Sequence, residues 1–159
     1  MNPISTFRRK LRERALDQYG YITTRDAAAL GIPGIEVVKI AERGGLEHIA
    51  YGLYRFEDVP ATDRDEFMEA VLRVGPGAFL MADAVLALHN LALVNPRRIR
   101  VGAPERVRAK LPDNIEAARL NVEPEALTRY EGIPATTVAR ALLDSQGLVM
   151  RERLIEAAQ

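Results

Sequence analysis

The chain has 159 residues, of which 48% are hydrophobic, so it is long enough to bury a core in one domain or in two small ones. It has no cysteine, no apolar segment directly after its basic N-terminus and no run of about 18 apolar residues, which argues against disulfides, a secretory signal and a membrane helix. The 22 lysines and arginines balance the 22 aspartates and glutamates, so the whole chain lacks the basic charge of many nucleic-acid binders. We expect a cytoplasmic protein.

The first predicted helix is strongly basic. Phe7, Leu11, Ala15 and Tyr19 recur every four residues and mark its buried side. Its cations, which share the segment with a single acidic residue, are Arg8, Arg9, Lys10, Arg12 and Arg14. Most of them are expected in solvent or against phosphate, and the pattern does not separate a solvated face from a DNA-binding one.

A short capped helix follows. Thr23 precedes a helix whose third residue is Asp26, so the threonine oxygen and the carboxylate can both accept from N–H groups at the first turn. The helix runs through residues 27–30 and ends at residues 31–34, Gly-Ile-Pro-Gly, because glycine permits unusual backbone angles and proline blocks continuation.

A second helix is predicted over residues 35–43. Its apolar stripe consists of Val37, Ile40, Ala41 and Gly44, and the residues that point away from this stripe are Glu36, Lys39 and Arg43. Two β-prone runs, residues 46–50 and 53–56, then form a hairpin closed by a turn that contains Gly52. The order helix, sharp turn, helix and hairpin predicts a winged helix-turn-helix, although such a unit also occurs in proteins that never contact DNA.

If this unit binds DNA, its outward cations divide into two groups. Lys39 and Arg43 lie one helical turn apart and can reach base edges or flanking phosphates, and Arg43 has the fork that guanine favours. Glu36 can accept from cytosine or repel a phosphate. Arg25, near the start of the preceding helix, and Arg55, beside the wing, are better placed for phosphate and add affinity more than specificity.

A second domain begins after a linker at residues 59–63. Helices are predicted over residues 65–74, 81–91, 138–143 and 151–158, and short strands over residues 98–101 and 119–122, with a loop or weak helix between the strands. The fold class is therefore α+β, with an N-terminal winged helix-turn-helix at residues 1–60 followed by a mixed α+β C-terminal domain at residues 61–159.

The sequence offers no good catalytic or metal site. Its two histidines, His48 and His89, fall in different predicted elements, and the direction of Asp83 on its helix differs widely from that of His89. The run Gly-Pro-Gly at residues 75–77 lacks the Lys and Ser/Thr of a phosphate loop. We expect no cofactor, no metal and no catalytic residue, and the remaining enzymatic alternative is an unrecognised carboxylate site that involves, for example, Asp83, Glu105 or Asp144.

Several motifs resemble a known family. Residues 19–32, Y-G-Y-I-T-T-R-D-A-A-A-L-G-I, and residues 41–55, A-E-R-G-G-L-E-H-I-A-Y-G-L-Y-R, closely resemble the winged-helix domain of AbiEi-type antitoxins of bacterial type IV toxin-antitoxin systems. Residues 78–92, 98–104 and 131–144 look like the C-terminal domain of that family. Family members often continue beyond this length, so we expect a short or truncated form.

The resemblance implies a transcriptional autorepressor, not an enzyme, that binds promoter repeats as operator DNA and counters a cognate nucleotidyltransferase-like toxin, directly or indirectly. By position, residues 34–43, beginning at Gly34, would be the recognition helix, and Tyr51 with Gly52 the wing tip. Tyr54 is expected to anchor the core. We expect a monomer in solution that places several copies on DNA, because no long apolar heptad argues for a coiled coil.

A basic patch in the second domain has several interpretations. Its members are Arg97, Arg98, Arg100, Arg106, Arg108 and Lys110. One interpretation is that the patch contacts DNA, the toxin or RNA. The other is that it is a solvated basic loop, and we favour the solvated loop. Two alternatives for the whole chain stay open: a module that neutralises the toxin by direct contact without specific DNA binding, and an enzyme that modifies or reverses the toxin's product.

Overall fold

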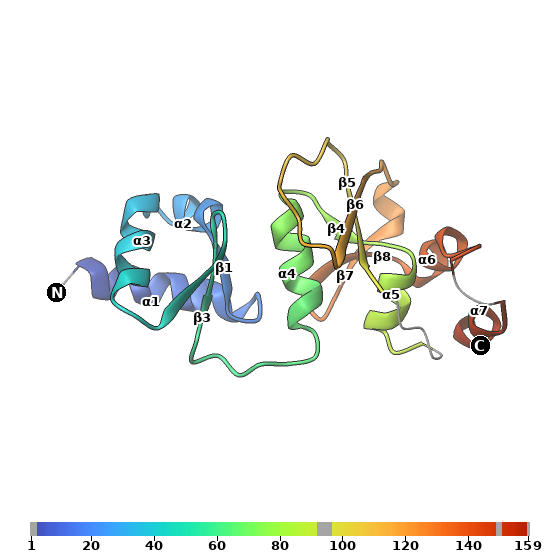
Figure 1. Cartoon of the computed structure of the whole chain (residues 1–159), viewed down its shortest axis with the longest axis horizontal. Coiled ribbons are helices and arrows are strands. Elements are labelled where there is room, and N and C mark those ends of the chain that lie inside the picture. The colour runs from blue at the N-terminus through green and yellow to red at the C-terminus, as the bar shows by residue number, and fades with distance from the viewer. Residues whose placement is uncertain (1–2, 92–96, 149–150, 159) are drawn as a thin grey trace. The chain divides into compact units, whose positions relative to one another are not determined.

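The computed structural model describes residues 3–91, 97–148 and 151–158 and divides into two compact units. The N-terminal unit comprises Met1–Asp65 and the C-terminal unit Glu66–Gln159. Helices and strands are present in both units, which confirms the α+β class (Figure 1). No helix in the described parts of the chain is long and apolar enough to cross a membrane.

The N-terminal unit is a winged helix-turn-helix (Figure 1). Its helices are α1 (Pro3–Leu16), α2 (Thr24–Ala29) and α3 (Gly34–Glu42), and its strands are β1 (Tyr21–Thr23), β2 (Leu46–Ala50) and β3 (Leu53–Phe56). The strands form an antiparallel sheet in the order β1-β3-β2. The three helices and the hairpin agree closely with the predicted elements, whereas β1 was missed because Tyr-Ile-Thr is too short to show an alternating pattern.

One core joins all the elements of this unit. Leu11 and Ala15 of α1, Val37 and Ile40 of α3 and Phe56 of β3 are each at most 2% exposed and pack in a single cluster. Tyr54 belongs to the same cluster, as expected for a core anchor. Since α3 buries one stripe in this core, its opposite side faces outward.

The C-terminal unit is built on a five-stranded mixed sheet. Its strands are β4 (Phe79–Leu80), β5 (Ile99–Ala103), β6 (Ile115–Arg119), β7 (Leu127–Tyr130) and β8 (Ile133–Thr136), in the order β6-β5-β4-β8-β7. β5 pairs parallel with β6 and β4 parallel with β8, while the β4–β5 and β7–β8 pairs are antiparallel. The short β4 therefore lies between the β5–β6 pair and the β7–β8 hairpin, and both of these follow it in the sequence.

Helices accompany this sheet. They are α4 (Asp65–Val74), α5 (Asp83–Leu88), the 3-10 turn η1 (Pro124–Ala126), α6 (Val138–Asp144) and α7 (Arg151–Ala158). α5 contacts both α6 and β5, and Figure 1 shows α4 on the other side of the sheet from α5 and α6. Thr137 caps α6 by accepting from the backbone N–H of Arg140 at 3.3 Å.

Four details of the sequence predictions were wrong. Tyr19 does not continue the buried side of α1, because the helix ends at Leu16 and Tyr19 adopts a left-handed φ of 60°. The helix predicted over residues 81–91 is the short α5, preceded by β4. The second predicted strand lies earlier, at β6, and the β7–β8 hairpin was missed.

Candidate nucleic-acid interface

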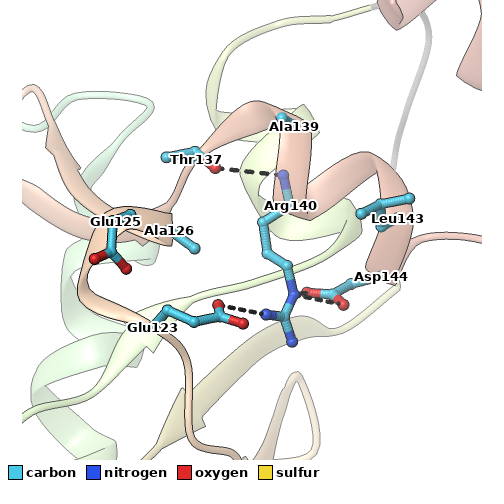
Figure 2. A pocket seen from close by; sticks show the side chains of 8 residues that line it. All are labelled: Glu123, Glu125, Ala126, Thr137, Ala139, Arg140, Leu143 and Asp144. Carbon is cyan, nitrogen blue, oxygen red and sulfur yellow. Dashed lines mark hydrogen bonds and ion pairs between the residues drawn. The ribbon is translucent and has the colours of Figure 1, made fainter.

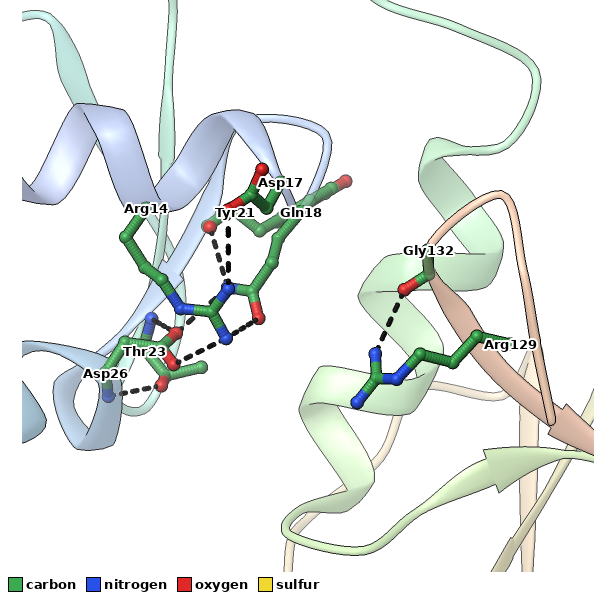
Figure 3. A network of polar contacts seen from close by, with 8 residues as sticks. All are labelled: Arg14, Asp17, Gln18, Tyr21, Thr23, Asp26, Arg129 and Gly132. Atoms are coloured by element: carbon green, nitrogen blue, oxygen red, sulfur yellow. Dashed lines mark hydrogen bonds and ion pairs between the residues drawn. The ribbon is translucent and has the colours of Figure 1, made fainter. Parts of the chain in front are cut away.

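The position of α2 is fixed by a polar network at its first turn (Figure 3). Thr23 and Asp26 form the predicted capping box, with the Asp26 N–H donating to Thr23 Oγ1 at 3.0 Å and the Thr23 N–H donating to Asp26 Oδ2 at 2.9 Å. Buried Gln18 donates from Nε2 to the same Asp26 oxygen at 2.9 Å, and Arg14 donates to Gln18 Oε1 at 3.1 Å. The end of α1 is thereby tied to the start of the helix-turn-helix.

The end of α3 is held by a cation of the first helix. Arg8 donates from Nη2 to the carbonyl oxygens of Ile40 at 3.2 Å and Gly44 at 3.0 Å. The Ile40 carbonyl also accepts from the backbone N–H of Arg43 at 3.2 Å, so the guanidinium adds further hydrogen bonds and a positive charge at the C-terminal end of α3. Arg8 therefore positions the candidate recognition helix from within the unit.

Most of the basic first helix is committed to contacts inside the protein. Besides Arg8, Arg12 donates from Nε to Asp58 Oδ2 at 3.1 Å, and Arg14 lies 3.7 Å from Asp26. Only Arg9 and Lys10 of the five predicted cations remain as exposed side chains for which the described structure records no such contact. Arg12 and Arg14 are still 42% exposed, so most of these cations do face solvent as expected, but sequence spacing does not show which acidic groups lie across the fold.

The outward side of α3 carries both charged and aliphatic groups. Lys39 lies 3.5 Å from Glu36 one turn earlier, and their side chains are 52% and 23% exposed. Ile35 and Val38 are 59% and 38% exposed, and the sequence analysis did not select either of them. Both are apolar residues that lie outside the buried stripe of Val37 and Ile40, and this position on the helix could have identified them.

The wing tip lies against the start of α2. The Thr24 N–H donates to the Gly52 carbonyl at 2.9 Å, so the turn after β2 is bonded to the helix-turn-helix. Gly52 has a φ of 68°, and a Cβ there would approach Thr24 Oγ1 to 2.9 Å, so both conformation and space favour glycine. Tyr51, beside it, is fully exposed at 103%.

Two of the predicted phosphate- or base-contacting arginines are exposed, and a third is held by contacts inside the protein. Arg25 and Arg43 are exposed, and Arg43 caps the end of α3 with its backbone. Arg55 differs: its side chain is 14% exposed, lies 3.0 Å from Asp65 and donates to the carbonyls of Phe56 and Val59. Its guanidinium also lies 5.5 Å from the Tyr21 ring. The prediction that Arg55 contacts phosphate is corrected, since its charge holds the linker after β3.

The basic patch predicted in the C-terminal unit is also smaller than expected. Arg100 lies 3.0 Å from Asp83 and 2.7 Å from Glu116, and is therefore removed from the patch. Burial raises the pKa of Asp83 above its ordinary value, and the Arg100 charge opposes that rise. The remaining members are exposed: Arg97, Arg98, Arg106, Arg108 and Lys110.

The candidate carboxylate site does not assemble as a cluster of free acids. Asp144 accepts from Arg140 Nε at 3.0 Å, and Arg140 also donates to Glu123 at 3.2 Å across an open surface pocket (Figure 2). Asp83 is engaged by Arg100. Within the described residues, no group of three or more histidines, cysteines, aspartates and glutamates is arranged to hold a metal ion.

The two histidines are in aromatic contacts within separate units. His48 packs against Tyr54 with ring centroids 4.9 Å apart, and His89 stacks on Tyr130 at 3.8 Å. Burial lowers the pKa of His89, so its neutral form is favoured. Both histidines therefore act as packing residues against a tyrosine ring.

Comparison with known proteins gives a family match for the N-terminal segment. Residues 9–56 match the family model described as transcriptional regulator, AbiEi antitoxin. A crystal structure of the RV2827C protein from Mycobacterium tuberculosis is similar at 15% sequence identity and a TM-score of 0.46, over 87% of this chain and 59% of that one. This chain thus spans 59% of that protein's length, and a search of curated proteins gives no match. The predicted resemblance to AbiEi antitoxin transcriptional regulators is confirmed through residues 9–56.

Proposed function

We propose that this chain is an antitoxin of a bacterial toxin-antitoxin system that binds operator DNA as a transcriptional autorepressor and counteracts a cognate nucleotidyltransferase-like toxin. One observation carries the proposal: the segment that matches antitoxin transcriptional regulators is folded as a winged helix-turn-helix. The protein acts in the cytoplasm, where operator and toxin are both accessible, and it performs no catalysis.

The exposed side of α3 enters the major groove. Arg43 and Lys39 reach base edges there, and Glu36 orients Lys39 through their 3.5 Å ion pair. Gly34 lets the start of α3 approach the DNA closely. Arg25 at the start of α2 contacts phosphate, as does the fully exposed Tyr51 of the wing through its hydroxyl.

The neutral charge of the whole chain is compatible with this interface, because the acidic groups pair with some arginines and leave others without an acidic partner. Asp26, Asp58 and Asp65 are each within ion-pair distance of an arginine of the N-terminal unit. Arg25 and Arg43 have no ion pair within the described residues and remain available for phosphate. Local charge, which decides phosphate binding, thus differs from the net charge.

A second candidate is a module that neutralises the toxin by direct contact without specific DNA binding. Exposed aliphatic side chains in the C-terminal unit favour it, since Leu143 is 65% and Leu148 45% exposed. Large exposed apolar groups are typical of surfaces that bind proteins when they cluster. This contact and DNA binding are compatible if they use different units.

Fluorescence anisotropy on the DNA upstream of the chain's own gene tests the proposal, with a scrambled duplex as control. We expect selective binding by the full chain that weakens with salt, with a logarithmic slope of about 0.9 for each phosphate contacted. Arg43→Ala should cost about 1–3 kcal/mol and relax sequence preference, while Arg25→Ala weakens all DNA alike. Equal or absent binding to the two duplexes would leave the protein-contact module as the better proposal.

A further inference from the structure

Two aliphatic side chains of α3 are exposed on the folded N-terminal unit. Ile35 and Val38 are 59% and 38% exposed, whereas Val37 and Ile40 on the same helix are fully buried. Residues three positions apart are neighbours on a helix surface, so the two side chains form one small apolar patch. Apolar surface left in water adds nothing to folding stability, so the patch points to a ligand outside the unit.

The backbone beside this patch is also free of internal packing. A Cβ built at Gly34, the first residue of α3, meets nothing within 4 Å, and the residue does not have a positive φ. Neither conformation nor space in the monomer requires glycine there. The missing side chain leaves room for close approach by a partner to the first turn of α3, where Ile35 lies.

The size and surroundings of the patch indicate the partner. Two side chains fall far below the roughly 800 Å² that each partner contributes to a stable protein interface. The same helix presents Lys39, whose side chain is 52% exposed, and ends at the exposed Arg43. Glu36 is paired with Lys39, and Glu42 is also exposed on this helix, so the apolar groups lie among charges of both signs. Small apolar groups beside cations match the major groove, where thymine carries a C5-methyl group between two phosphate backbones.

We propose that Ile35 and Val38 read thymine methyl groups in the major groove, so that the preferred DNA has A·T pairs opposite the first turns of α3. This inference rests on the proposed DNA binding of the N-terminal unit. The C5-methyl group distinguishes thymine from cytosine, which has a hydrogen atom at the same ring position. Aliphatic contacts thereby add selectivity for thymine to the polar contacts of Lys39 and Arg43.

The test first obtains a DNA sequence and then removes single methyl groups. The full chain selects duplexes from a random-sequence library, and each thymine of a selected duplex is replaced in turn by deoxyuridine, which lacks only the methyl. We expect one or two positions at which this replacement weakens binding about threefold to fourfold, the effect of burying one methyl-sized group. Binding at other positions should stay within error.

Alanine variants then assign the methyl contacts to residues. Ile35→Ala and Val38→Ala should each abolish the loss caused by deoxyuridine at one of these positions. Leu16→Ala, which truncates a side chain that is 52% exposed on α1, should retain it. Because all three side chains are exposed, circular dichroism melting should show an unchanged fold for each variant.

The outcomes separate this inference from the function on which it rests. Selective DNA binding with equal affinity for thymine and deoxyuridine duplexes overturns the methyl contacts and leaves the repressor proposal intact. A library that yields no preferred sequence overturns both. If Ile35→Ala instead reduces self-association in sedimentation equilibrium while the thymine preference is unchanged, the patch binds a second copy and the inference is wrong.

Discussion

The two units of this chain use their arginines differently. In the N-terminal unit, Arg8 and Arg55 hold the end of α3 and the linker after β3, while Arg25 and Arg43 remain exposed around the helix-turn-helix. In the C-terminal unit, Arg100 of β5 forms ion pairs with Asp83 of α5 and Glu116 of β6. The neighbouring Arg97 and Arg98 are exposed and take no part in these ion pairs. A count of cations therefore does not locate a nucleic-acid surface, because neighbouring arginines in the sequence can be structural or free.

The largest expected effect tests whether the N-terminal unit has its own core. Phe56→Ala should reduce the free energy of unfolding of this unit by about 3–5 kcal/mol, because a fully buried ring leaves a cavity. Urea denaturation monitored by amide NMR signals measures the loss in each unit separately. Tyr51→Ala, which truncates a fully exposed ring, should change stability by no more than about 0.5 kcal/mol. Equal destabilisation of both units by Phe56→Ala would contradict the division into two cores.

The next effect tests the structural role of an arginine in the C-terminal unit. Arg100→Met should destabilise this unit by about 3 kcal/mol at neutral pH, because it removes the only cation that the described residues place beside the buried carboxylate of Asp83. Arg98→Met, at an exposed position near the same strand, is the control and should have little effect. Chemical denaturation of both variants measures the difference.

The same variant has an expected pH dependence. Burial raises the pKa of Asp83, so its contribution to stability is complete below the pKa of the unfolded chain and is lost as pH rises through the folded value. Removing Arg100 removes the charge that opposes this rise. The destabilisation should therefore shrink as the pH is lowered toward about 4, where the carboxyl is protonated. A loss that is independent of pH would show that the Asp83 charge is not responsible.

A smaller effect separates structural from DNA-binding arginines in the N-terminal unit. Arg55→Met should lower the stability of this unit by about 2 kcal/mol, because Asp65 and two carbonyls lose a mostly buried partner, and should leave DNA affinity unchanged in conditions where the unit is folded. Arg25→Met is the matched variant: it should weaken DNA binding and leave the stability of the unit unchanged. Denaturation and anisotropy together measure the contrast. Weakened DNA binding without lost stability in Arg55→Met would restore the phosphate contact.

The smallest effect concerns glycines on either side of the helix-turn-helix. Gly34→Ala should stabilise the N-terminal unit by up to about 1 kcal/mol, since alanine is the better helix former and its Cβ meets nothing. Gly52→Ala should destabilise it because of the positive φ and the nearby Thr24 hydroxyl. Thermal melting distinguishes the signs. A stabilised Gly34→Ala protein with weaker DNA binding would support close approach of DNA at this residue.

Much of the N-terminal unit was predictable because its signals are local. The Thr23–Asp26 capping box, the turn around Gly31 and the hairpin around Gly52 each depend on residues a few positions apart. The candidate interface was predicted less completely. Tyr51 is exposed at the wing tip as its position suggested, but the charge of Arg55 is used by Asp65, a partner ten residues away that no helical or strand period indicates.

The C-terminal sheet was less predictable because its strands pair across the chain. β4 has two residues, between β5 and β8, and is too short for any alternating pattern. Ala82 then turns the chain into α5 with a φ of 52°, a conformation that alanine rarely adopts, so the sequence predicted one continuous helix. The pairing of β4 with β5 and β8, which is not visible in the local sequence, ends the strand directly before this residue.

The sequence by itself determined the helix-turn-helix, its wing, the α+β class and the family resemblance, because caps, turns and apolar stripes act over a few residues. The tertiary structure decided which cations are engaged, since the hydrogen bonds of Arg8 to the end of α3 and the ion pair of Arg100 with Asp83 form between segments more than 15 residues apart. It also decided that Ile35 and Val38 face outward together, because only packing of α3 on the core defines its exposed side.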